Sequence, residues 1–181
     1  MLKRHLTSNK EKCLWLVPTE PMRSVLRERI SQLAIEFKSA PFDPHVTVFA
    51  WEGTDVEAHS VVKIIASSFR PISLTFQAID HSLEFSKTLF LQFERSAELC
   101  RMYDNVKEQM TRKSNYALNP HLSLLYQSID TDRRLALCNE LNLPAGTYSF
   151  DSIKVIETES PLQNPGQVRR WRKIVEATLM G

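Results

Sequence analysis

Glycine is scarce in this sequence: there are four among 181 residues, and none belongs to a glycine-rich loop of the kind that cradles phosphate. The three cysteines, Cys13, Cys100 and Cys138, stand far apart and include no Cys-x-x-Cys pair. This spacing argues against a disulfide scaffold and against a cysteine-rich zinc site. We therefore expect reduced thiols and a cytoplasmic protein.

Long apolar runs and a strong net charge are missing as well. No stretch approaches the ~20 apolar residues of a membrane span, and the charged segment Met1 to Lys12 lacks the apolar part of a secretory signal. Lys and Arg outnumber Asp and Glu by only two, 23 against 21. We expect neither a membrane nor a long nucleic acid as partner, since the latter favours a concentrated basic face. A small anionic substrate remains compatible with this charge.

The composition is that of a soluble globular protein, with 43% hydrophobic and 24% charged residues. A chain of 181 residues is long enough for a hydrophobic core of its own. We predict one domain over residues 1–181, and a monomer.

Apolar periodicity and capping residues predict alternating helices and strands. Thr19 is expected to cap the first helix, Thr54 and Glu57 to form a capping box at the second, and Ser96 to cap the third. The expected strands cover residues 13–17, 45–51, 72–80, 88–93, 121–127, 148–156 and 170–179, and the expected helices cover 21–38, 54–69, 97–112 and 131–141.

The pattern repeats with a shift of 76 positions, which carries His45 to His121, Pro44 to Pro120 and Thr47 to Ser123. Helix, histidine strand, helix, strand, strand thus occurs twice, in pseudo-repeats of about 19–95 and 96–181. The alternative is a coincidence of similar element lengths. We favour an internal duplication, in which two like halves pack about a pseudo-twofold axis and bring their histidines face to face.

The two histidine strands begin Pro44-His45-Val46-Thr47 and Pro120-His121-Leu122-Ser123. Residues two apart in a strand point to the same face, so each half offers one imidazole and one hydroxyl to a shared surface. Their neighbours Val46, Val48, Leu122 and Leu124 should face the core.

This set of side chains suits the cleavage of a phosphate ester. An imidazole has a pKa of about 6.5 and is available in either charge state near neutral pH. One neutral histidine can accept a proton from water while a charged one gives a proton to the leaving oxygen. Two hydroxyls can donate to non-bridging phosphate oxygens and hold the phosphorus in line between the imidazoles. We predict His45 and His121 as catalytic and Thr47 and Ser123 as substrate-binding residues, and we leave open which histidine is the base.

Other uses of histidine fit the sequence less well. A metal site needs three or four ligands at suitable spacing, and no His-x-His, His-Glu-x-x-His or Cys/His cluster is present, so we expect no metal and no cofactor. His5 also begins a His-x-Thr sequence, but in a charged tail. We interpret His59 and His81 as surface or structural residues.

The paired motifs resemble those of the two-histidine (2H) phosphoesterase superfamily, and most closely its plant and yeast-type cyclic phosphodiesterases. The likeness includes Trp15 in the first strand, Tyr126 after the second motif and Trp171 near the last strand. It implies a bilobal α+β fold, with two antiparallel sheets facing across a central cleft and helices packed outside. It also implies that Tyr126 and Trp15 lie at the site. Strand alternation alone would turn Tyr126 away, unless a bend or bulge follows Leu124.

The resemblance further implies metal-independent hydrolysis of ADP-ribose 1″,2″-cyclic phosphate, a step downstream of tRNA splicing, and of nucleoside 2′,3′-cyclic phosphates to 2′-phosphates. The alternatives are an enzyme acting on the cyclic phosphate at RNA ends, including ligation, and a nucleotide-binding module without turnover. We expect residues 158–169 to form a loop that shapes substrate choice, with Arg169 and Arg170 available to a second phosphate.

Overall fold

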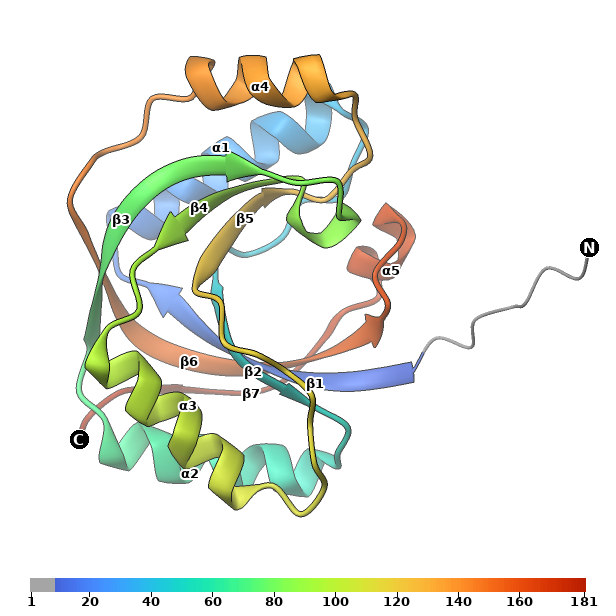
Figure 1. Cartoon of the computed structure of the whole chain (residues 1–181). Helices are drawn as coiled ribbons and strands as arrows, with labels where there is room; N and C mark the ends of the chain where they lie inside the picture. The colour runs from blue at the N-terminus through green and yellow to red at the C-terminus, as the bar shows by residue number, and fades with distance from the viewer. Residues whose placement is uncertain (1–8) are drawn as a thin grey trace, which may run out of the picture.

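The computed structural model describes residues 9–181, so His5 and most of the charged N-terminal segment lie outside the described part (Figure 1). Within residues 9–181, seven strands and five α-helices follow one another. The strands are β1 (Asn9–Pro18), β2 (Val46–Trp51), β3 (Ile72–His81), β4 (Leu89–Phe93), β5 (His121–Leu125), β6 (Thr147–Ser160) and β7 (Arg172–Thr178). The helices are α1 (Met22–Glu36), α2 (Asp55–Ser68), α3 (Ala97–Gln109), α4 (Thr131–Glu140) and α5 (Pro165–Arg169), with a 3₁₀ turn, η1, at Phe85–Lys87.

These elements confirm the predicted α+β class, but the arrangement of the strands differs from the expected pair of separate sheets. All strands belong to one seven-stranded sheet, in the order β1-β2-β5-β4-β3-β6-β7, with an additional pairing of β1 and β6. The first residues of β6 pair with β3, and the rest of that strand pairs with β1 and β7. Because this one long strand pairs with β3 at one end and with β1 and β7 along the rest, it joins what we expected to be two sheets.

Strands β2 and β5 are joined by the single residue pair Val46–Leu122. These two residues are 76 positions apart, and so are the cross-strand partners Ser73 and Ser149. In each pair, a residue of the first repeat therefore faces its own equivalent in the second, as expected for two repeats related by a pseudo-twofold axis. The internal duplication itself stays a prediction.

The helices cover the sheet from two sides, with α1 and α4 on one and α2 and α3 on the other (Figure 1). Helix α1 contacts β5, and α4 contacts β3 and β4, whereas α2 contacts β6 and β7 and α3 contacts β2. The helical side of the histidine strands is apolar as predicted, because Val46, Val48, Leu122 and Leu124 are fully buried. The opposite side of these strands is therefore left for polar residues.

Local sequence signals explain most helix ends. Thr54 and Glu57 form the predicted capping box of α2, and the Ser96 side chain accepts a hydrogen bond from the Leu99 amide. The prediction for Thr19 was wrong, because α1 begins after Pro21 and has no side-chain cap. None of the helices in residues 9–181 is long and apolar enough to cross a membrane.

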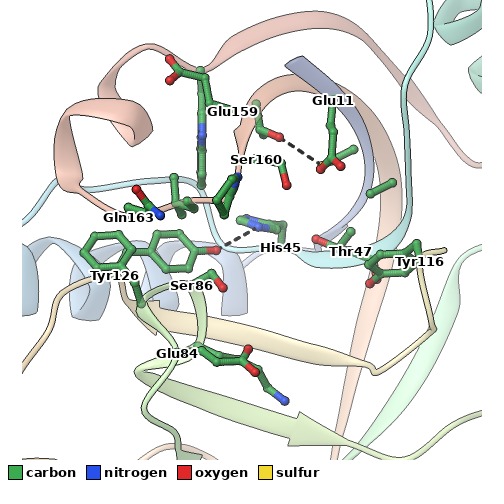
Figure 2. A pocket seen from close by; sticks show the side chains of 18 of the residues that line it. Glu11, His45, Thr47, Glu84, Ser86, Tyr116, Tyr126, Glu159, Ser160 and Gln163 are labelled. Atoms are coloured by element: carbon green, nitrogen blue, oxygen red, sulfur yellow. Dashed lines mark hydrogen bonds between the residues drawn. The ribbon is translucent and has the colours of Figure 1, made fainter. Parts of the chain in front are cut away.

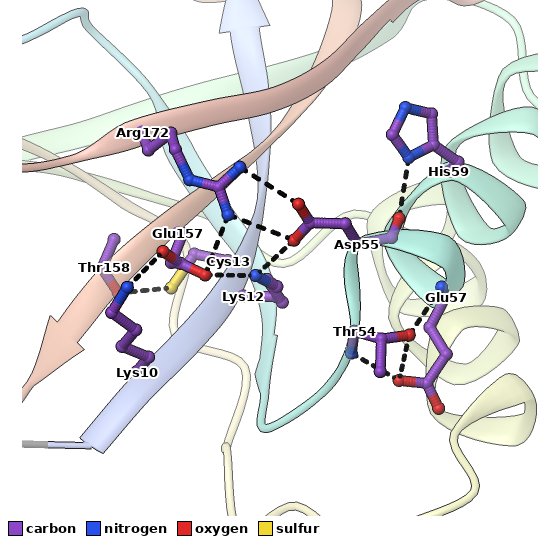
Figure 3. Close-up of polar contacts among 10 residues, drawn as sticks. All are labelled: Lys10, Lys12, Cys13, Thr54, Asp55, Glu57, His59, Glu157, Thr158 and Arg172. Atoms are coloured by element: carbon purple, nitrogen blue, oxygen red, sulfur yellow. Dashed lines mark hydrogen bonds and ion pairs between the residues drawn. The ribbon is translucent and has the colours of Figure 1, made fainter.

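A network of ion pairs fixes the start of α2 to the sheet (Figure 3). The Lys12 ammonium on β1 is almost inaccessible and donates to Glu157 of β6 at 2.5 Å and to Asp55 of α2 at 2.7 Å. Arg172 of β7 donates to the same two carboxylates. These cations lower the pKa of both Asp55 and Glu157 to about 2, chiefly through the hydrogen bonds from Lys12.

The segment 158–169 was predicted as a loop, and that prediction was wrong. β6 continues to Ser160, and Pro165 to Arg169 form the short helix α5. Asn164 and Gln167 make a capping box at the start of this helix, with Pro165 in its first turn. We read the proline and glycine here as loop signals, whereas the proline marks a helix start.

Candidate active site

A pocket of about 630 Å³ lies on the polar side of the histidine strands (Figure 2). Among the predicted site residues, Trp15, His45, Thr47, His121 and Tyr126 line it, whereas Ser123 does not. The other walls come from β1, β2, the η1 turn, the segment before β5, the end of β6 and the residues on either side of α5. They comprise Glu11, Cys13, Ala50, Glu84, Phe85, Ser86, Lys87, Tyr116, Thr158, Glu159, Ser160, Pro161, Leu162, Gln163 and Trp171. The pocket is thus built from both halves of the chain.

Both histidines are held in the same way. The Nδ1 atom of His45 lies 2.6 Å from the carbonyl oxygen of Asp43, and that of His121 lies 2.7 Å from the carbonyl oxygen of Asn119. A carbonyl oxygen can only accept, so Nδ1 must carry the proton in each neutral ring. In the neutral imidazole, Nε2 is then the unprotonated atom that can take a proton.

The two rings differ in their surroundings. His45 is only 4% exposed, its ring is stacked on Trp15 with 3.5 Å between centroids, and its Nε2 lies 3.5 Å from the Tyr126 hydroxyl. His121 is half-buried and meets Phe90 edge to face. Burial lowers the pKa of His45 to about 3, with a further contribution from the charge of Lys154. Burial also lowers the pKa of His121, with help from Lys87.

The hydroxyls of the two motifs are placed differently. Thr47 lines the pocket, but the Ser123 hydroxyl is buried and donates to the carbonyl oxygen of Ser86 at 3.1 Å. Ser123 therefore supports the wall of the pocket in this structure, and it has to release Ser86 before it can donate to a bound phosphate.

Tyr126 lines the pocket together with Trp15, although alternation along β5 would turn its side chain away. β5 ends at Leu125, so the alternation no longer applies to the next residue. Two further aromatic rings complete the surroundings of His45: Phe42, stacked on Tyr126 at 4.2 Å, and Trp171, in edge contact with Trp15 at 5.3 Å. We missed Phe42, whose position three residues before His45 carries no periodic signal.

Positively charged residues at the pocket are few. Among its described lining residues, Lys87 is the only lysine or arginine, and its ammonium lies 4.5 Å from the centre of the Phe90 ring. Neither Arg169 nor Arg170 belongs to the lining: Arg169 donates to the Ser39 carbonyl and Arg170 pairs with Glu159. Within residues 9–181, no group of three or more His, Cys, Asp and Glu side chains is placed to hold a metal ion.

The sequence model of the 2′-5′ RNA ligase superfamily matches residues 43–161, a span that includes both histidine strands. The chain belongs to this superfamily. The match confirms the expected family of two-histidine phosphoesterases and, with it, the prediction that the chain is an enzyme.

Three further similarities extend the family match. The chain is 24% identical over 141 residues to a cyclic phosphodiesterase of Arabidopsis thaliana, covering 77% of this chain and 74% of the relative. E. coli LigT, solved in complex with 3′-AMP, superimposes with a TM-score of 0.58 at 13% identity, over 95% of this chain and 99% of LigT. The Thermus thermophilus protein TT0787 gives a TM-score of 0.61 at 11% identity, over 93% of this chain and 97% of that protein. These structures share the superfamily fold.

Proposed function

We propose that this enzyme hydrolyses a cyclic phosphate without a metal ion, using His45 and His121 as general base and general acid. The observation that carries the proposal is that two motif-equivalent histidines line one pocket, each with Nδ1 held by a backbone carbonyl. The resemblance to a cyclic phosphodiesterase supports the same reaction.

The reaction begins with a water molecule in line with the bond that will break. His45 Nε2 accepts a proton from this water as its oxygen attacks the phosphorus. The bond from phosphorus to one ring oxygen then breaks, and His121 donates its Nε2 proton to that oxygen. The products are a phosphomonoester and a neighbouring free hydroxyl, and a later proton exchange with solvent restores both rings.

The different burial of the two histidines supports this division of roles. Because His45 is the more deeply buried ring and Lys154 adds to the effect, its pKa is lowered to about 3. His121 is less buried, so it takes up a proton first as the pH falls. The pair required for turnover, neutral His45 with charged His121, is then the main form between the two pKa values. The opposite assignment would leave the reactive pair a minor form.

Thr47 and Lys87 are the groups we assign to the phosphate, and both line the pocket. The Thr47 hydroxyl can donate to a non-bridging oxygen, and the ammonium can balance the charge that develops in the transition state. The Tyr126 hydroxyl keeps its proton because burial raises its pKa, so it can donate as well. Substrate candidates are nucleoside 2′,3′-cyclic phosphates, giving 2′-phosphates, and ADP-ribose 1″,2″-cyclic phosphate, giving the 1″-phosphate.

The family description favours one second candidate, an enzyme that acts on RNA ends, either opening a terminal 2′,3′-cyclic phosphate or joining ends. The experiment that separates these possibilities follows the phosphorus-31 spectrum of each reaction. The three substrates are a nucleoside 2′,3′-cyclic phosphate, ADP-ribose 1″,2″-cyclic phosphate and an oligoribonucleotide with a 2′,3′-cyclic phosphate end. We expect fastest conversion of a small cyclic phosphate. Turnover of the oligonucleotide alone would favour the RNA enzyme, and binding without any product would favour a nucleotide-binding module.

A further inference from the structure

Lys154 is a buried lysine behind the site, in the middle of β6. Its side chain is 3% exposed, and it does not line the pocket. A buried ammonium is unfavourable by several kcal/mol unless it is paired. Lys154 has two partners in the structure, and both of them also contact His45.

The first partner is Asp43. Its carboxylate accepts a hydrogen bond from the Lys154 ammonium, and its backbone carbonyl oxygen holds His45 Nδ1 at 2.6 Å. Arg23 and Arg27 also approach this carboxylate, at 3.7 and 3.3 Å. Lys154 is the most buried of these three cations, and it connects Asp43 to the middle of the sheet.

The second partner is Trp15. Lys154 and Trp15 are cross-strand neighbours on β6 and β1, and the ammonium lies 5.7 Å from the centre of the indole ring. His45 stacks on the same ring with 3.5 Å between centroids and 7° between planes. A cation near an aromatic ring attracts it electrostatically. Lys154 thus contacts Asp43, which binds the edge of the imidazole, and Trp15, whose ring covers its face.

We propose that Lys154 is a positioning residue for His45, fixing the Asp43 carbonyl and the Trp15 ring between which the imidazole is oriented. This inference rests on the proposed function for its consequence in turnover, but its contacts are independent of any substrate. The positive charge has a second effect, since it disfavours a proton on His45 and keeps Nε2 free to act as a base.

Several groups besides Lys154 act on the charge of His45. Asp43 raises its pKa, His121 lowers it, and burial lowers it most. The Tyr126 hydroxyl faces Nε2 from the segment after β5, while Trp15, Phe42 and Trp171 add uncharged surface. Removing the lysine leaves burial in place and leaves Asp43 paired with its arginines. The pKa of His45 should then rise, without reaching the value of an exposed histidine.

The test compares Lys154→Met with Lys154→Arg, which restores the charge, and with Lys173→Met, a control on β7 whose side chain is 59% exposed. The first readout is a nitrogen-15 NMR titration of His45 in the substrate-free protein. We expect Lys154→Met to raise the pKa of His45 by about one unit and to weaken the preference for a proton on Nδ1. The arginine variant should restore both in part, and the control should change neither.

The second readout is the pH dependence of turnover of a 2′,3′-cyclic nucleotide. In Lys154→Met the acid limb of kcat/KM should move to higher pH, and kcat should fall about ten- to hundredfold through misplacement of the base, with KM changed less. If this variant does not fold, Lys154→Gln serves instead, because its neutral amide can still hydrogen-bond to Asp43.

An unchanged His45 titration and an unchanged acid limb in a folded variant would overturn the proposal, whatever the loss of stability. Failure of the proposed function gives a different result. In that case wild type would give no product, or His45→Ala would keep full turnover, while the NMR titration would still report on Lys154 and His45.

Discussion

Val46 lies directly opposite Leu122 in the antiparallel pairing of β2 with β5, and each of these residues follows the histidine of its motif. In this antiparallel register His45 comes across from Ser123, and Thr47 comes across from His121. Because residues two apart share a face, all four side chains belong to the face opposite Val46 and Leu122. One buried apolar pair therefore aligns the two motifs.

The plot of kcat/KM against pH should be bell-shaped, with its maximum below pH 6.5. The acid limb reports protonation of His45, and the alkaline limb reports loss of the proton from His121. Both pKa values are lowered in the folded protein, that of His45 to about 3, so both limbs move to lower pH. The measurement is kcat/KM for a 2′,3′-cyclic nucleotide over a wide pH range. A maximum well above pH 7 would contradict the burial argument.

Lys87→Met should move the alkaline limb to higher pH, because the charge of Lys87 lowers the pKa of His121. It should also reduce kcat/KM, since the pocket loses its one lysine or arginine among the described lining residues. Lys113→Met is a suitable control, on an exposed residue outside the pocket lining. A profile that keeps its shape and height would show that Lys87 is a solvated rim residue.

Thr47→Val should weaken transition-state binding by about 1–3 kcal/mol, the value of a charge-assisted hydrogen bond. Ser123→Ala should weaken it less, because the Ser123 hydroxyl already donates to Ser86 and has to exchange partners. The measurement is kcat/KM for each variant, with the exposed Ser73→Ala on β3 as a control. A larger loss in Ser123→Ala than in Thr47→Val would mean that the serine turns toward the phosphate.

Lys12→Met should lower the free energy of unfolding by about 1–2 kcal/mol, because two charged hydrogen bonds disappear while Arg172 keeps both carboxylates paired. Lys10→Met is the control: its side chain is 73% exposed, and we expect a change within about 0.5 kcal/mol. The measurement is urea unfolding at several pH values.

The effect of Lys12 should also depend on pH in a defined direction. Asp55 and Glu157 have pKa values lowered to about 2 in the folded protein, so their contribution is complete above the unfolded values of about 4. It is lost as the pH falls toward 2. The difference between wild type and Lys12→Met should therefore narrow on acidification. A difference that is constant from neutral to acid pH would rule out an ionic origin.

Much of the fold could be predicted because its signals are local. Alternation of apolar residues indicates the strands, and the Thr54–Glu57 capping box gives the start of α2. The joining of the strands into one sheet could not be predicted, because it depends on the long-range pairings of β6. The start of α5 was missed because proline and glycine, here Pro165 and Gly166, are typical of turns as well as of helix ends.

The pocket could be predicted in part, from paired motifs whose spacing repeats. The burial of Lys154 could not be predicted. It stands between the buried residues Ile153 and Val155, and strand alternation would place such a lysine on a solvated face. Its burial follows from the pairing of β6 with β1, which brings Trp15 and the Asp43 segment over it. The position of Ser123 likewise depends on a tertiary contact with the η1 turn.

The central claim is that His45 and His121 act as a metal-independent acid and base. It is tested most directly by the rate of conversion of a nucleoside 2′,3′-cyclic phosphate to the 2′-phosphate in EDTA, in wild type, His45→Ala, His121→Ala and the exposed control His59→Ala. We expect wild type and the control to be equally active with and without EDTA, and each site variant to lose at least ~100-fold in kcat while remaining folded. Full turnover in either site variant, or wild-type activity that EDTA abolishes and a divalent metal restores, would contradict the account.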